Sequence, residues 1–346
     1  MKRIIITTSI LFILLFLAAC GNTEEASEQN DSQVEVYTTV YPLQYFADRI
    51  GGEFVNVSSI YPAGANEHTF EPTQKDMMAL AEADLFFYIG LGLEGFVENA
   101  KKTLAEEHVK LIATVDAVSD EQLEQSVHVH EEAVTEDALD HEHEEATTED
   151  AHDHEHEDES TEEHDSHEGH DHGDIDPHVW ISPKISQSLA LSIKDSLVEI
   201  SPEHQETFEK NYEELVNELQ KLDADFEEMA QTAPSKTFFV SHAAFGYIAN
   251  TYGLEQVAVA GLNSQDEPSQ KELTKLIDLA EEKKMKYILF EQNVSSKLTE
   301  VIRQEIGADS LVLHNLGVLS TEDIENKETY FTLMNKNLET LKTVLN

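Results

Sequence analysis

Residues 34–61 have the sequence VEVYTTVYPLQYFADRIGGEFVNVSSIY. Its first eight residues alternate in polarity and predict a strand over 34–41, and Pro42 then begins a helical pattern that continues to Ile50. A second strand is predicted over 55–61. A strand, a helix and a strand in succession indicate a parallel sheet that is covered by helices.

The same rhythm recurs along the chain and predicts an α/β fold with mostly parallel sheets flanked by helices. Thr73 and Asp76 occupy the N-cap and capping-box positions of a helix predicted over 73–82. Further strands are predicted over 84–89, 109–115, 237–241, 256–260, 287–290 and 310–316. Further helices are predicted over 243–252, 268–283, 295–306 and 325–345.

A helical region separates the two groups of strands. One helix is predicted over 183–200, and Ser201 with Pro202 predicts the start of another that is about 30 residues long. Its apolar positions recur at spacings of three, four and seven residues, which is one stripe of a helix; they are Phe208, Tyr212, Leu215, Leu219, Leu222, Phe226 and Met229. A helix of this length can connect two domains.

Residues 128–172 form a tract with 11 of the 17 histidines and 20 acidic residues, without Lys, Arg or an aromatic residue. Such a composition binds divalent transition metals but cannot build a packed core. We expect several weak, exchangeable sites in it, because a flexible segment loses conformational entropy when it binds. The candidate side chains are His152, His154, His156, His164, His167, His170 and His172.

The N-terminus predicts export. Lys2 and Arg3 precede an apolar run that ends in Leu17-Ala18-Ala19-Cys20, which is typical of a secretory signal and too short for a stable membrane span. The last four residues resemble the lipobox of bacterial lipoproteins, which implies lipid on Cys20. Cys20 is the only cysteine, so an internal disulfide is excluded. The net charge of −48 argues against nucleic acid as a partner.

Four polar side chains are predicted at strand ends or loop mouths: His68, His178, His242 and Glu291. Ligands of parallel α/β sheets gather at the carboxyl ends of strands, so these groups are expected to converge as a tetrahedral zinc shell. Position alone leaves alternatives open. Each histidine is compatible with an ordinary solvated or hydrogen-bonded role, and Glu291 with a helix N-terminus.

Four motifs carry a family resemblance: HTFEPT from His68, DPHVW from Asp176, SHAAFGY from Ser241 and ADLFFYIGLGLE from Ala83. They resemble the zinc- and manganese-binding solute-binding proteins of ABC transporters. The resemblance implies two α/β lobes joined by one long helix, with Zn²⁺ between them. It also implies an extracytoplasmic, lipid-anchored monomer that delivers zinc to a membrane permease and is not an enzyme.

The resemblance assigns metal ligation to the positions of His68, His178, His242 and Glu291. Manganese receptors usually have a carboxylate at the position of His242, and zinc accepts more nitrogen ligands than manganese does, so zinc is favoured. The expected organisation is a signal peptide (1–19), a tether (20–33), a first lobe (34–182) with a disordered insertion (119–174), a helical region (183–233) and a second lobe (234–346).

Three other functions remain open at this point. A manganese receptor or adhesin of the same fold differs in its ligands. A surface zinc buffer would act through the His-rich tract. A zinc hydrolase would need an open coordination position and a base such as Glu67 or Glu71, but the chain lacks the usual catalytic motifs.

Overall fold

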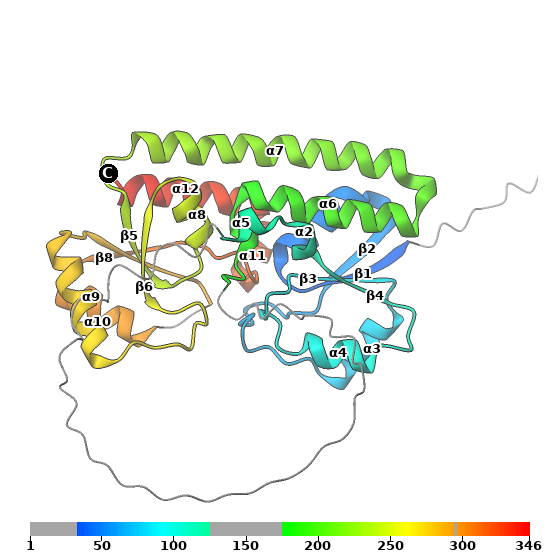
Figure 1. Ribbon diagram of the computed structural model, residues 1–346, viewed down its shortest axis with the longest axis horizontal. Coiled ribbons are helices and arrows are strands. Elements are labelled where there is room, and N and C mark those ends of the chain that lie inside the picture. The colour runs from blue at the N-terminus through cyan, green and yellow to red at the C-terminus, as the bar shows by residue number, and fades with distance from the viewer. Residues whose placement is uncertain (1–32, 125–174, 294–295) are drawn as a thin grey trace, which may run out of the picture. The chain divides into compact units, whose positions relative to one another are not determined.

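Two parallel β-sheets of four strands each form the framework of the protein. The computed structural model describes residues 33–124, 175–293 and 296–346 (Figure 1). Within that part, Val34–Asn346 forms one compact unit. The predicted α/β class, with parallel sheets flanked by helices, is confirmed.

The first sheet has the strand order β2-β1-β3-β4. Its strands are β1 (Val34–Thr38), β2 (Val55–Ser59), β3 (Leu85–Tyr88) and β4 (Lys110–Ala113). All three pairings are parallel, with Val34 opposite Val55 and Val36 opposite Leu85. The carboxyl ends of these strands therefore lie at one edge of the sheet, and the loop that follows β2 leaves from that edge.

The second sheet repeats this topology in the order β6-β5-β7-β8. Its strands are β5 (Thr237–His242), β6 (Glu255–Ala260), β7 (Tyr287–Phe290) and β8 (Asp309–Val312). Every residue of β5 is buried, because Phe238 packs into the main core on one face and Phe239 into a smaller apolar cluster on the other. Coverage of both faces explains why residues 238–240 of the strand are all apolar.

The helices surround the sheets (Figure 1). They are α2 (Tyr41–Gly51), α3 (Gln74–Glu82), α4 (Val97–Thr103), α5 (Asp120–Glu124), α6 (Pro183–Ile200), α7 (Gln205–Thr232), α8 (Gly246–Thr251), α9 (Gln270–Glu282), α10 (Lys297–Glu305), α11 (Thr321–Glu325) and α12 (Tyr330–Val344). The capping box predicted at Thr73 and Asp76 begins α3, with reciprocal hydrogen bonds between the two residues. No described helix combines the length and the apolar character needed to cross a membrane.

Helix α7 is the long helix of the prediction, and it has 28 residues. Its predicted stripe is buried except at Tyr212, which is half-buried. The stripe packs on α6, on α2 of the first sheet and on α12, which follows the second sheet (Figure 1). The expected start at Ser201 is wrong, because Pro202–His204 forms a separate 3₁₀ turn and α7 begins at Gln205.

Three local predictions differ from the structure. The last strand ends at Val312, so residues 313–320 leave the second sheet and are free to approach the first. The predicted terminal helix over 325–345 begins too early: α12 starts at Tyr330, and residues 326–329, with Lys327 in a left-handed conformation, separate it from the short α11 that ends at Glu325. Helix α5 occupies the beginning of the predicted insertion. The rest of the insertion, with its seven candidate histidines, and the segment containing Cys20 lie outside the described residues.

Candidate metal centre

His68 reaches the centre from the loop that follows β2. The side-chain Oδ1 of Asn66 accepts a hydrogen bond from the backbone N–H of His68 at 2.9 Å, which fixes the turn that carries the imidazole. The residue is partly exposed. Its Nε2 lies 3.1 Å from Nε2 of His178.

His178 precedes a buried 3₁₀ turn, Val179–Ile181, which leads into α6. The carboxylate of Asp176 accepts hydrogen bonds from the backbone N–H of His178 at 2.9 Å and from its Nδ1 at 2.7 Å. The side chains of both residues are almost completely buried. Because Asp176 engages Nδ1, the ring presents Nε2 to the other histidines.

His242 is the last residue of β5 and is completely buried. Its Nδ1 lies 3.1 and 3.2 Å from the two carboxylate oxygens of Glu291, which follows β7. Its Nε2 lies 2.9 Å from the carbonyl oxygen of Leu262. Both ring nitrogens therefore face hydrogen-bond acceptors.

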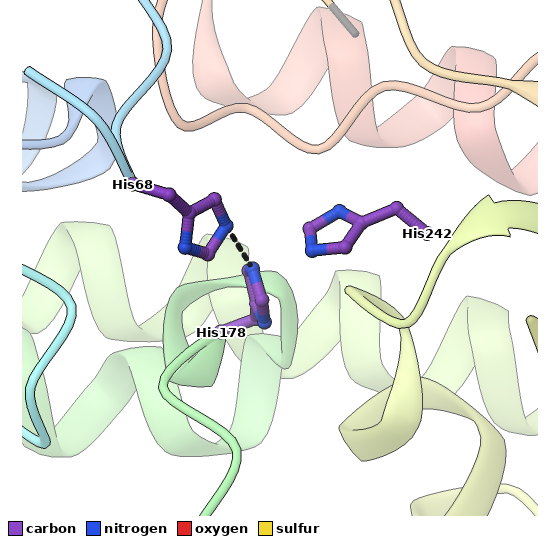
Figure 2. Close-up of side chains that lie close together, drawn as sticks. All are labelled: His68, His178 and His242. Atoms are coloured by element: carbon purple, nitrogen blue, oxygen red, sulfur yellow. Dashed lines mark hydrogen bonds between the residues drawn. The ribbon is translucent and has the colours of Figure 1, made fainter. Parts of the chain in front are cut away.

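The three histidines converge, although they come from three separate segments (Figure 2). One ligand nitrogen of each lies within 4.8 Å of the others. Among the described residues this is the group of His, Cys, Asp and Glu side chains whose geometry suits a metal ion, and it does not include Glu291. Glu291 lies beside the group, against His242.

Burial and charge give these side chains opposite protonation tendencies. Burial, together with the neighbouring His178 and His242, lowers the pKa of His68 to about 2. Burial alone would lower the pKa of His242 as well, but the charge of Glu291 outweighs it and raises the pKa of His242 to about 9. Burial thus favours the neutral form of His68, whereas the charge of Glu291 favours the protonated form of His242.

A second buried carboxylate, Glu67, lies at the centre. Burial raises its pKa above the usual range, and its Oε1 accepts a hydrogen bond from Nδ2 of Asn315 at 2.8 Å. Sequence analysis identified Glu67 only as a possible base of a hydrolase, and it did not identify Asn315, which lies within the strand expected over 310–316. Asp176 could have been identified from the sequence, because it lies two residues before His178 in the same short motif.

The remaining described histidines have other surroundings. His108 is mostly exposed, and His204 stacks on Phe54 with ring centroids 3.7 Å apart. His314 is buried beside Asp323, with its Nε2 3.2 Å from a carboxylate oxygen. None of these three belongs to the group around His68.

Comparison with known proteins identifies the family to which the sequence is similar. Residues 36–344 match the family model ZnuA, described as zinc-uptake complex component A, periplasmic. The chain is 34% identical over 333 residues to the high-affinity zinc uptake system protein ZnuA of Bacillus subtilis (strain 168), covering 96% of this chain and 94% of that protein.

Two further matches concern one streptococcal protein. The chain is 35% identical over 334 residues to the zinc-binding lipoprotein AdcA of Streptococcus pneumoniae (strain ATCC BAA-255 / R6), covering 95% of this chain. It spans only 58% of the length of AdcA. The crystal structure of the Zn(II)-bound ZnuA-like domain of AdcA matches with a TM-score of 0.66 and 32% identity, covering 90% of this chain and 99% of that domain.

Proposed function

The chain belongs to the family of the periplasmic zinc-uptake complex component A, and from this premise we propose that it is an extracytoplasmic receptor that captures Zn²⁺ for import. This family consists of solute-binding receptors rather than enzymes. Zinc is the cargo of such a receptor. We further propose that the protein has no catalytic activity and that it delivers zinc to an ABC permease.

The observation that carries the proposal is the convergence of His68, His178 and His242. A tetrahedral zinc ion with bonds of about 2.0–2.1 Å to nitrogen separates its ligand nitrogens by about 3.3 Å. The Nε2 atoms of His68 and His178 lie 3.1 Å apart, which is close to that separation. Nitrogen donors of this kind favour zinc over manganese.

Glu291 is the proposed fourth ligand. Its carboxylate adjoins His242 and supplies the negative charge that a dication requires. In this proposal zinc displaces the proton between His242 and Glu291, and one oxygen of the Glu291 carboxylate then enters the shell. A closed shell of three nitrogens and one oxygen suits transport better than hydrolysis, which needs an open position.

The rest of the chain has roles in anchoring the receptor and in dividing it into lobes. We assign residues 34–182 and 234–346 to two lobes on either side of the helical region, and Cys20 to lipid attachment after removal of a signal peptide. The chain is proposed to act as a monomer, and the His-rich tract to supply weak auxiliary sites. Changing Cys20 to Ala should move the protein from the membrane fraction to the medium.

A zinc titration of a variant lacking residues 128–172 tests the central claim. One tight site should remain, and His68→Ala, His178→Ala and His242→Ala should each weaken it by more than the roughly 10- to 100-fold that loss of an outer-shell partner costs. His108→Ala is the matched control, because His108 is exposed and outside the cluster. If the shortened chain loses nearly all zinc binding, the protein is a surface buffer that acts through its tract.

A further inference from the structure

Asn315 connects the two buried carboxylates of the metal centre. Its single Nδ2 donates one hydrogen bond to Oε1 of Glu67 at 2.8 Å and another to Oε2 of Glu291 at 2.8 Å. An amide nitrogen has two hydrogens, so both are used. Glu67 lies in the loop after β2 of the first sheet and Glu291 directly follows β7 of the second, so one side chain holds carboxylates from both halves of the site.

Other contacts fix the orientation of this amide. Its Oδ1 accepts a hydrogen bond from the backbone N–H of Gly317 at 2.9 Å, which leaves Nδ2 directed at the carboxylates. Trp180 donates its indole N–H to the backbone carbonyl of Asn315 at 2.7 Å. Asn315 is 6% exposed. The side chain is therefore preorganised rather than free to rotate with its partners.

The backbone around Asn315 is shaped for this contact. Leu316 has a φ of 59°, in the left-handed region that a branched side chain rarely adopts. A Cβ on Gly317 would lie 2.5 Å from Oε1 of Glu67, so only glycine allows the carboxylate to approach. Strained backbone of this kind persists where the surroundings hold it, and it is concentrated at functional sites.

We propose that Asn315 is a specificity-determining residue that limits the number of carboxylate oxygens available to the bound cation. The inference rests on the proposed zinc receptor and adds the means by which it rejects manganese. The hydrogen bond from Asn315 competes with a cation for Oε2 of Glu291, which disfavours binding through both oxygens of that carboxylate, and a second one holds Oε1 of Glu67.

The chemistry of the two cations gives the direction of the effect. Zn²⁺ is satisfied by four ligands and accepts nitrogen, whereas Mn²⁺ prefers oxygen ligands in an octahedral arrangement. Three imidazoles and one carboxylate oxygen suit zinc. Release of the second oxygen of Glu291 and of Glu67 would add oxygen donors and raise the coordination number, which is what manganese requires.

The experiment measures Zn²⁺ and Mn²⁺ dissociation constants for the full chain, Asn315→Ala and Asn315→Asp. Both substitutions remove the double donation, and Asn315→Asp keeps the shape of the side chain. Each should reduce the preference for zinc over manganese by at least about tenfold, the scale of an outer-shell substitution. Bound Co²⁺ should change from the intense visible absorption of a tetrahedral ion to the weak absorption of a six-coordinate one.

Asn337→Ala is the matched control. Asn337 is buried, like Asn315, and it stabilises the same segment. Its side chain forms two hydrogen bonds of 2.7 Å with the backbone of His314. It touches neither carboxylate, so its loss should lower thermal stability but leave the zinc preference and the Co²⁺ spectrum unchanged.

Three outcomes overturn the inference: an unchanged zinc preference in both Asn315 variants, an equal loss in Asn337→Ala, or failure of both Asn315 variants to fold. The last outcome would make Asn315 a structural residue. Failure of the unsubstituted chain to bind zinc is a different result, because it would refute the proposed function itself.

Discussion

The carboxylate of Asp176 lies 2.7 Å from Nδ1 of His178, and the same oxygen accepts the backbone N–H of His178 at 2.9 Å. One carboxylate oxygen thus fixes both the peptide and the ring. A carboxylate behind a metal-binding histidine selects its tautomer and increases its basicity. Asp176 is therefore part of the centre even though it does not belong to the group formed by the three histidines.

Substitution of Asp176 by Ala should weaken zinc binding by about 10- to 100-fold, because the ring of His178 loses its orientation and its polarising partner. Isothermal titration of the variant lacking residues 128–172 measures this effect. Asp223→Ala is the comparison, since Asp223 also accepts a hydrogen bond, from Tyr252 at 2.7 Å, outside the metal centre. Equal affinities in the two variants would contradict the assignment of Asp176.

Trp180 should report occupation of the centre by its fluorescence. It is the only tryptophan of the chain, it is fully buried, and its ring centroid lies 5.3 Å from that of His178. Replacement of an imidazole proton by a dication changes the electric field at the indole. Emission should therefore change with the first equivalent of zinc and then remain constant, even if the tract binds more.

The same titration of His178→Ala should leave the emission of Trp180 unchanged at one equivalent. A response that continued to grow over many equivalents, or that survived in His178→Ala, would show that the fluorescence follows the tract instead of the centre.

Leu219→Ala should destabilise the protein by about 2–5 kcal/mol, which is the usual cost of a cavity at a fully buried leucine. Leu219 has no exposed surface and lies in the middle of α7. Denaturant unfolding of the metal-free protein measures the loss. Lys221→Ala, two residues away on the exposed side of the same helix, should change the free energy of unfolding by less than about 0.5 kcal/mol. Similar losses in the two variants would show that α7 does not contribute through its buried stripe.

The pair formed by Asp323 and His314 should make stability depend on acid pH. The hydrogen bond from His314, assisted by those from Ser320, holds the pKa of Asp323 well below its usual value of 3.8. A carboxyl whose pKa is lowered by folding stabilises the protein above the unfolded pKa, and this contribution is lost as pH falls below about 4.

Asp323→Asn should therefore be less stable than the unsubstituted chain at pH 7, and the difference should shrink as pH falls from about 4 towards 2. Thermal unfolding of both proteins across this range is the measurement. A difference that stays constant down to the lowest pH would mean that the charge of Asp323 contributes nothing and that only the shape of the side chain matters.

Local patterns in the sequence predicted much of the framework. The alternation of Val34 and Val36, the capping box at Thr73 and the stripe of α7 each depend on residues a few positions apart, so periodicity is enough to detect them. The predicted ends of some helices and strands were wrong where two local signals compete. At Ser201 a good N-cap residue begins only a 3₁₀ turn, and beyond Val312 apolar residues leave the sheet to pack elsewhere.

The sequence by itself determined the element types, the parallel sheets and three histidines suited to a metal. The tertiary structure decided which groups surround them: Asn315 meets Glu67 across 248 residues, and Glu291 faces His242 rather than completing the histidine cluster. Helical and strand periods act over a few residues, whereas these contacts depend on how two sheets and residues 313–320 pack together. No local period encodes that packing.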